Sequence, residues 1–190
     1  MAGVAVAGVV AILSTTLWWA DRGETLTLGV AVGSGPSPVN VPLSFAGTLG
    51  TTHGHPVELT GVRAIGATDG LQVEFHRLKD GDLGTYRGSL ADAYAVAPLL
   101  GTRIEGPLES PDATRIAISV AARRPGLYRL PRIEVSYHSG WRTRSVTTTL
   151  NMCMLVLSDS DYATYMAALP AAPGGRLGAQ SEALDRCERN

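Results

Sequence analysis

The sequence predicts an all-β antiparallel sandwich that follows an N-terminal transmembrane helix and precedes a short, partly helical tail. Three observations lead to this prediction. The chain begins with a long uncharged run, continues as short β-rich runs separated by turn residues, and shows a period-two apolar pattern in its second half. We expect the anchor at residues 1–22, the sandwich at 23–157 and the tail at 158–190.

Composition limits the classes of partner. The 190 residues suffice for one domain with tails, and the 16 basic and 17 acidic residues are spread without blocks. Because neither a basic arm nor an acidic tail is present, we expect no nucleic-acid partner. The domain is long enough to bury a core without a metal or a disulfide framework.

The first uncharged run has the length of a membrane span. Residues Ala2–Ala20 carry no charge and would rise about 28 Å as a helix, close to the roughly 30 Å of bilayer hydrocarbon. Trp18 and Trp19 end the run, where indole rings favour the membrane interface, and Asp21 follows. We therefore expect an uncleaved single-pass anchor.

A cleaved signal peptide and a buried core helix are the alternatives. Cleavage after Ala20 would put the bulky Trp18 at a position that requires a small residue. A core helix would be unusually long without a charge. Because the following residues resemble secreted β-structure, we expect the β-domain on the extracytoplasmic side of the plasma membrane.

The first half of the sandwich is predicted from β-rich runs bounded by turns. Four extended segments are expected, the last two of them joined by a tight turn at Asp69-Gly70. These segments are Thr25–Val32, Val39–Leu49, Val57–Ala67 and Leu71–Leu78. Leu90–Leu100 is either a short helix ended by Pro98 or a crossover loop.

The second half has the clearest alternation. Ile116, Ile118 and Val120 share one face of a predicted strand, and Ile133, Val135 and Tyr137 share one face of the next. Alternation over such lengths is typical of half-buried antiparallel strands. After Leu157, Ser158 and the acidic residues near it predict the start of a short helix reaching Leu169.

The loop after Tyr137 decides how the next strand is aligned. A two-residue turn would place Arg142 and Arg144 on the same face as Tyr137 and Val135 and so bury two charges. A three-residue loop, 138–140, instead pairs Tyr137 with Trp141 and Glu134 with Arg144. Since the buried face usually sets strand register and opposite charges stabilise a cross-strand pair, we expect the three-residue loop.

A short motif precedes the predicted strand that contains Ile133, Val135 and Tyr137. Arg124-Pro125-Gly126-Leu127-Tyr128 resembles the tyrosine corner of immunoglobulin-like sandwiches, in which a tyrosine hydroxyl near the start of a late strand bonds upstream backbone. The chain also resembles, at the level of this superfold, the sandwich modules of bacterial envelope and surface proteins. The resemblance implies a structural role for Tyr128 and an immunoglobulin-like topology, whereas the cysteine pattern of antibody domains is missing.

The two cysteines are a candidate disulfide. Cys153 and Cys187 enclose a 34-residue interval, and a bridge in an oxidising compartment would tie the tail to the last strand. A buried free Cys153 with an exposed Cys187 is the alternative.

Soft and imidazole ligands suggest a weak candidate metal site. Met152, Met154, His53 and His55 carry donor types that suit copper. Met152 and Met154 flank Cys153 in the sequence. In a strand, however, the two methionines share one face while Cys153 points away, so these three adjacent side chains would not converge on one ion. We expect the methionines in the core and the histidines in a solvated loop.

The functional prediction is a non-enzymatic interaction or accessory subunit of the cell envelope. The sequence contains no hydrolase elbow, zinc-protease motif, phosphate-binding loop or dinucleotide fingerprint, so we expect neither catalysis nor a cofactor. The expected partners are the membrane, through the N-terminal helix, and another envelope protein. The alternative is an extracytoplasmic copper-binding domain that uses Met152, Met154 and histidines.

Overall fold

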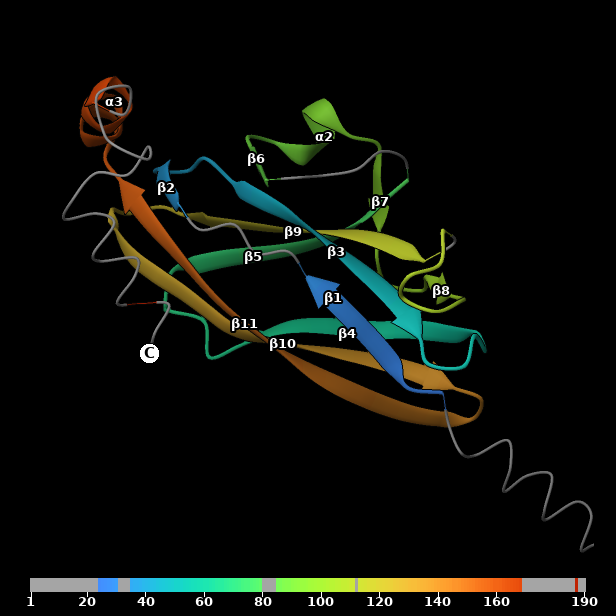
Figure 1. Cartoon of the computed structure of the whole chain (residues 1–190). Coiled ribbons are helices and arrows are strands. Elements are labelled where there is room, and N and C mark those ends of the chain that lie inside the picture. The colour runs from blue at the N-terminus through green and yellow to red at the C-terminus, as the bar shows by residue number, and fades with distance from the viewer. Residues whose placement is uncertain (1–23, 31–34, 80–84, 112, 169–186, 188–190) are drawn as a thin grey trace, which may run out of the picture.

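The computed structural model describes residues 24–30, 35–79, 85–111, 113–168 and 187. These residues form two β-sheets packed face to face (Figure 1). The first sheet has the order β1 (Leu26–Val30), β3 (Leu43–Thr51), β9 (Thr114–Ala122), β5 (Leu71–Leu78), β7 (Val96–Pro98), with β6 (Thr85–Arg87) also beside β3. The second has the order β2 (Gly35–Pro38), β11 (Arg142–Leu157), β10 (Gly126–Ser139), β4 (Val57–Ile65), β8 (Arg103–Ile104).

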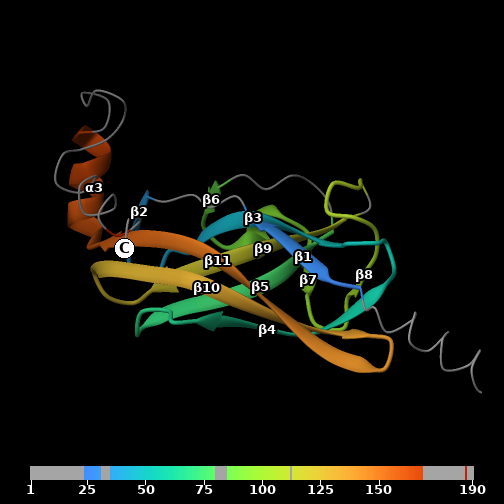
Figure 2. The same ribbon diagram turned by 60° about the horizontal axis from the view of Figure 1, so that its bottom comes forward.

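The strand order agrees with an immunoglobulin-like sandwich at a coarse level. Strands β1, β3, β9 and β5 occupy the places of strands A, B, E and D, and β11, β10 and β4 those of G, F and C. The first strand is divided between the sheets, because β1 pairs antiparallel with β3 while β2 pairs parallel with β11. The β10–β11 hairpin runs along the whole sandwich, with α3 (Asp159–Ala168) at one end and the hairpin tip at the other (Figure 2).

The core lies between the sheets, as the alternation predicts. Ile116, Ile118 and Val120 are buried on β9, and Ile133, Val135 and Tyr137 are buried on β10. The outer face of β9 is also covered, which the sequence analysis did not expect. Ala117 packs there with Leu78 and Leu90, the latter in α2 (Leu90–Ala93), because the long β5–β9 connection folds back over the first sheet.

The expected register of the β10–β11 hairpin is wrong. Tyr137 pairs with Arg144, and Gly140-Trp141 form a two-residue loop between Ser139 and Arg142. Gly140 has φ 60°, the positive angle that the first position of a type II′ turn requires. Arg144 is tolerated on the inner face because β11 is an edge strand along this stretch, so the side chain is only half-buried.

The turn at Asp69-Gly70 is present, but it does not make a hairpin. The amide of Leu71 donates to the carbonyl of Thr68 over 3.1 Å, and Gly70 has φ 85°. The strands that it joins, β4 and β5, belong to different sheets. The turn therefore carries the chain across the sandwich.

The structure shows what forms at Leu90–Leu100 and directly after Leu157. Leu90–Leu100 contains both a short helix, α2, and the edge strand β7. Helix α3 starts directly after Ser158, whose hydroxyl accepts the amide hydrogen bond of Asp161 at 3.2 Å.

The expected anchor at 1–22 and most of the tail lie outside the described residues. Within the described ranges, no helix has the length and apolar character of a membrane span.

Candidate functional site

Tyr128 occupies the corner that the sequence motif suggests. Its hydroxyl donates to the carbonyl of Arg124 over 3.0 Å, and its side chain is buried at the start of β10. This bond closes the turn between β9 and β10. The role of Tyr128 is therefore structural.

Glu134 is paired, but with a different arginine from the one expected. Its direct neighbour on β11 is Thr147, whereas an Arg63 guanidinium nitrogen on β4 lies 3.0 Å from its carboxylate. The expected Glu134–Arg144 pair is thus absent, because the two-residue loop shifts β11 along β10. The observed ion pair lies on the outer face of the second sheet.

Cys153 and Cys187 form a disulfide bond in the structure. Cys153 is fully buried on β11, and Cys187 is the one residue beyond α3 that the structure describes. The bridge ties the distal part of the tail to the last strand.

The candidate metal ligands do not converge. Met152 and Met154 are fully buried in the core, opposite Leu130 and Tyr128. His53 and His55 are exposed in the β3–β4 loop. Among the described residues no group of three or more histidine, cysteine or acidic side chains is placed to hold a metal ion.

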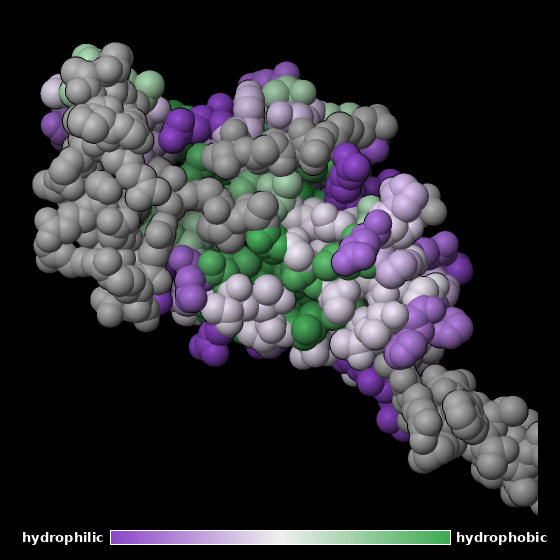
Figure 3. All heavy atoms as spheres, viewed as in Figure 1, coloured by the Kyte–Doolittle hydropathy of each residue, from purple (hydrophilic) through white to green (hydrophobic). Residues whose placement is uncertain are grey.

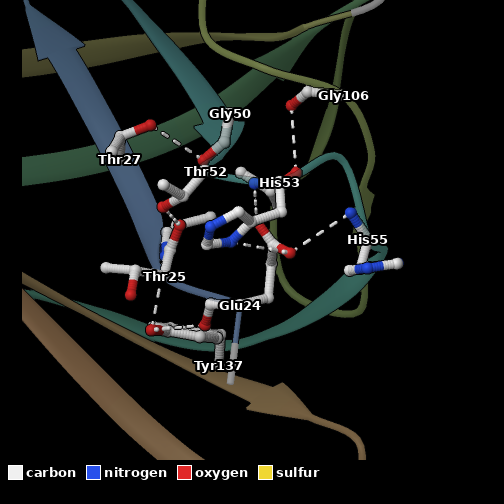
Figure 4. A network of polar contacts seen from close by, with 11 residues as sticks. Glu24, Thr25, Thr27, Gly50, Thr52, His53, His55, Gly106 and Tyr137 are labelled. Atoms are coloured by element: carbon white, nitrogen blue, oxygen red, sulfur yellow. Dashed lines mark hydrogen bonds and ion pairs between the residues drawn. The ribbon is translucent and has the colours of Figure 1, made fainter. Parts of the chain in front are cut away.

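A buried carboxylate anchors the histidine loop (Figure 4). The Glu24 side chain is 2% exposed and accepts hydrogen bonds from the backbone amides of His53 and His55, the second at 3.3 Å. The backbone carbonyl of Glu24 accepts the Tyr137 hydroxyl hydrogen bond at 3.4 Å. Sequence analysis did not single out Glu24, since its partners lie 29 to 113 positions away.

On one side of the sandwich, a long strand edge has no partner strand among the residues that the structure describes. From Arg142 to Asn151, β11 pairs only with β10 among the described residues, and β2 joins its other edge only from Met154 onward. Across from this edge lies β1, and apolar side chains gather between the two strands (Figure 3). We call this surface the β1–β11 seam and define it by the partly buried residues Leu28, Val30 and Val146.

The tip of the hairpin adds an aromatic residue at the end of the seam. Trp141 is 74% exposed, and the Arg142 guanidinium carbon lies 4.6 Å from the centre of its ring. Exposed tryptophan and arginine side chains are common among the residues that dominate protein interfaces.

The opposite side of the sandwich contains an apolar cleft. It has a volume of about 540 Å³ and lies between β4 of the second sheet and β5 and β7 of the first. We call it the β4–β7 cleft; its lining residues are Val62, Phe75, His76, Val96, Ala97, Pro98, Leu99 and Leu100.

No protein-family model and no curated protein matches the chain. Among solved structures, the GAE domain of GGA2p from Saccharomyces cerevisiae aligns at 6% identity and a TM-score of 0.36, covering 68% of this chain and 89% of that one. The fimbrial subunit AggA from Escherichia coli aligns at 14% identity and a TM-score of 0.31, covering 70% and 95%.

A third alignment is with a family 123 glycoside hydrolase from Clostridium perfringens. It has 9% identity and a TM-score of 0.40, and covers 70% of this chain but 27% of the hydrolase. Scores this low carry no argument about function. The fold assignment rests on the strand pairing described above.

Proposed function

We propose that this chain is a non-enzymatic interaction domain of the cell envelope, attached to the plasma membrane by its N-terminal segment, with the sandwich on the extracytoplasmic side. The observation that carries the proposal is the β1–β11 seam, where a strand edge that is unpaired among the described residues lies beside half-buried apolar side chains. The partner is another envelope protein that supplies an extended segment.

Strand addition explains how the seam would bind. Backbone amides and carbonyls along β11 would pair with the incoming segment, and every second side chain would point between the sheets onto Leu28, Val30 and Val146.

The Cys153–Cys187 bond supports the proposed location. Disulfides persist in oxidising compartments outside the cytoplasm and are rare within it. The uncharged run at residues 2–20 supports attachment to the membrane. Protease added to intact spheroplasts should therefore cleave the β-domain; full protection of the domain would contradict this orientation.

The binding proposal is tested by affinity purification of the full chain from membranes solubilised in mild detergent. A partner recovered with the wild type should be reduced at least tenfold with Val146→Lys, which puts a charge into the seam. Thr147→Lys is the matched control, because Thr147 is exposed on the opposite face of β11 and should leave recovery unchanged. Equal recovery with both variants, or recovery of the chain alone, would count against the seam.

A further inference from the structure

The β4–β7 cleft lies between the edges of the two sheets, on the far side of the sandwich from the seam. Val62 comes from the inner face of β4, and Phe75 from the inner face of β5. Leu99 is buried, whereas Leu100 next to it is 61% exposed. The volume of about 540 Å³ is within the range of sites that enclose a ligand group.

In the described part of the chain, the edge of β4 is unpaired where the cleft begins. Strand β8 pairs with β4 only at Val57 and Glu58. The last backbone bonds on this side join Leu59 to Thr102 and Gly101, each at 2.9 Å. From Thr60 to Ile65, the described residues supply no backbone partner on this side of β4.

An open edge beside an apolar cleft favours an extended peptide over a small apolar molecule. A strand added to β4 would direct alternate side chains into the space between the sheets, where Val62, Phe75 and Leu99 offer an apolar surface. Its backbone would satisfy the free amides and carbonyls of β4. A lipid chain or other apolar compound would fill the cleft without using the edge.

A cation at the margin of the cleft specifies the charge of that peptide. Arg77 follows Phe75 on the inner face of β5, opposite the buried Ile116, and pairs with the cleft residue Ala97 on β7. It is half-buried, and it has no ion-pair partner among the described residues. A partly desolvated arginine that no described carboxylate pairs with favours a ligand that supplies one.

We propose that the β4–β7 cleft is a second peptide-binding site, which takes an extended segment of a partner protein carrying a large apolar side chain with a carboxylate residue near it. The segment adds to the edge of β4 at Thr60–Ile65, inserts the apolar side chain over Val62 and Phe75, and pairs the carboxylate with Arg77. The inference deepens the proposed function, on which it rests, by adding a site distinct from the seam.

The probe is a phage-displayed library of nine-residue random peptides, selected against the full chain in detergent micelles. Enriched peptides should share one large apolar residue with an aspartate or glutamate nearby. A synthetic copy of an enriched peptide should bind the Val62→Lys protein at least tenfold more weakly than the wild type. A second synthetic peptide carries lysine in place of the acidic residue. The Arg77→Glu protein should bind this lysine peptide better than it binds the acidic one. Absence of enrichment, or equal binding to Val62→Lys, would overturn the proposal.

Two controls separate this site from the seam. Val146 is the counterpart of Val62 at the other edge of the second sheet. The Val146→Lys protein should therefore bind the selected peptide with unchanged affinity, although it no longer recovers the seam partner. Loss of peptide binding in Val146→Lys alone would assign the peptide to the seam and overturn the cleft. If Val62→Lys does not fold, the exposed Leu100→Asp replaces it, with the same tenfold loss expected.

Methylation of the peptide backbone tests strand addition itself. Methyl groups on alternate amides, those that face β4, should abolish binding, whereas methyl groups on the intervening amides should change affinity less than threefold. A peptide that tolerates methylation at every position would show that the cleft binds side chains alone, which contradicts the proposal.

Discussion

Val62 and Val146 lie on opposite sides of Val135 in the second sheet, the first paired with it from β4 and the second from β11. Both are half-buried on the inner face, although Val135 between them is 1% exposed. The difference arises because β8 and β2 are too short to cover β4 and β11 along their whole length. Each valine therefore marks an open margin of the sandwich.

The hydrogen bond of the tyrosine corner should contribute measurably to stability. Tyr128→Phe removes the donor to the carbonyl of Arg124 and should lower the free energy of unfolding by about 1 kcal/mol. Urea denaturation measures the change. Tyr94→Phe is the matched control, because Tyr94 packs on Tyr86 through its ring, and it should change stability by less than about 0.5 kcal/mol. Equal effects of the two variants would contradict a special role for Tyr128.

Gly50 should be intolerant of any side chain. A Cβ atom there would lie 2.3 Å from the backbone nitrogen of Leu108, in the β8–β9 connection packed over β3. Gly50→Ala should therefore destabilise the fold by about 2 kcal/mol, as measured by thermal unfolding. Gly61→Ala is the comparison, since its Cβ would meet Ser136 Cβ at an ordinary 3.6 Å. A Gly50→Ala protein as stable as Gly61→Ala would refute the close contact.

The register of the hairpin predicts which charges are coupled. A double-mutant cycle between Arg63 and Glu134 should give a coupling free energy of about 0.2–1 kcal/mol, because the pair is partly exposed. The cycle between Glu134 and Arg144 should give a value close to zero, because Thr147 stands opposite Glu134. If urea unfolding showed coupling between Glu134 and Arg144 and none between Arg63 and Glu134, the result would support the three-residue loop instead.

The disulfide should stabilise the whole chain. Closing a 34-residue interval is worth about 3–4 kcal/mol in the chain-entropy treatment, so Cys187→Ser should lower the free energy of unfolding by about that amount. Dithiothreitol should reproduce the loss in the wild type and have no further effect on the Cys153→Ser/Cys187→Ser double variant. A wild type whose urea midpoint is insensitive to reductant would contradict the prediction.

Features that depend on neighbouring residues could be predicted from the sequence. The buried rows on β9 and β10 follow from side chains that alternate in every strand. The Tyr128 corner and the cap at Ser158 involve partners three or four positions away, so a short motif contains all that they need. The placement of Met152 and Met154 in the core follows from the same alternation.

Features that depend on distant partners were decided only by the tertiary structure. The register error at Arg144 arose because the sequence does not say that β11 has an open edge where that side chain can reach solvent. The hydrogen bonds of Glu24, the packing of Leu78 and Leu90 over Ala117, and the β4–β7 cleft likewise depend on distant segments. Each is set by where those segments pair and where the pairing stops. Local periodicity thus determines which face of a strand is buried, while the choice of neighbouring strand, and with it both candidate binding surfaces, is a property of the folded chain.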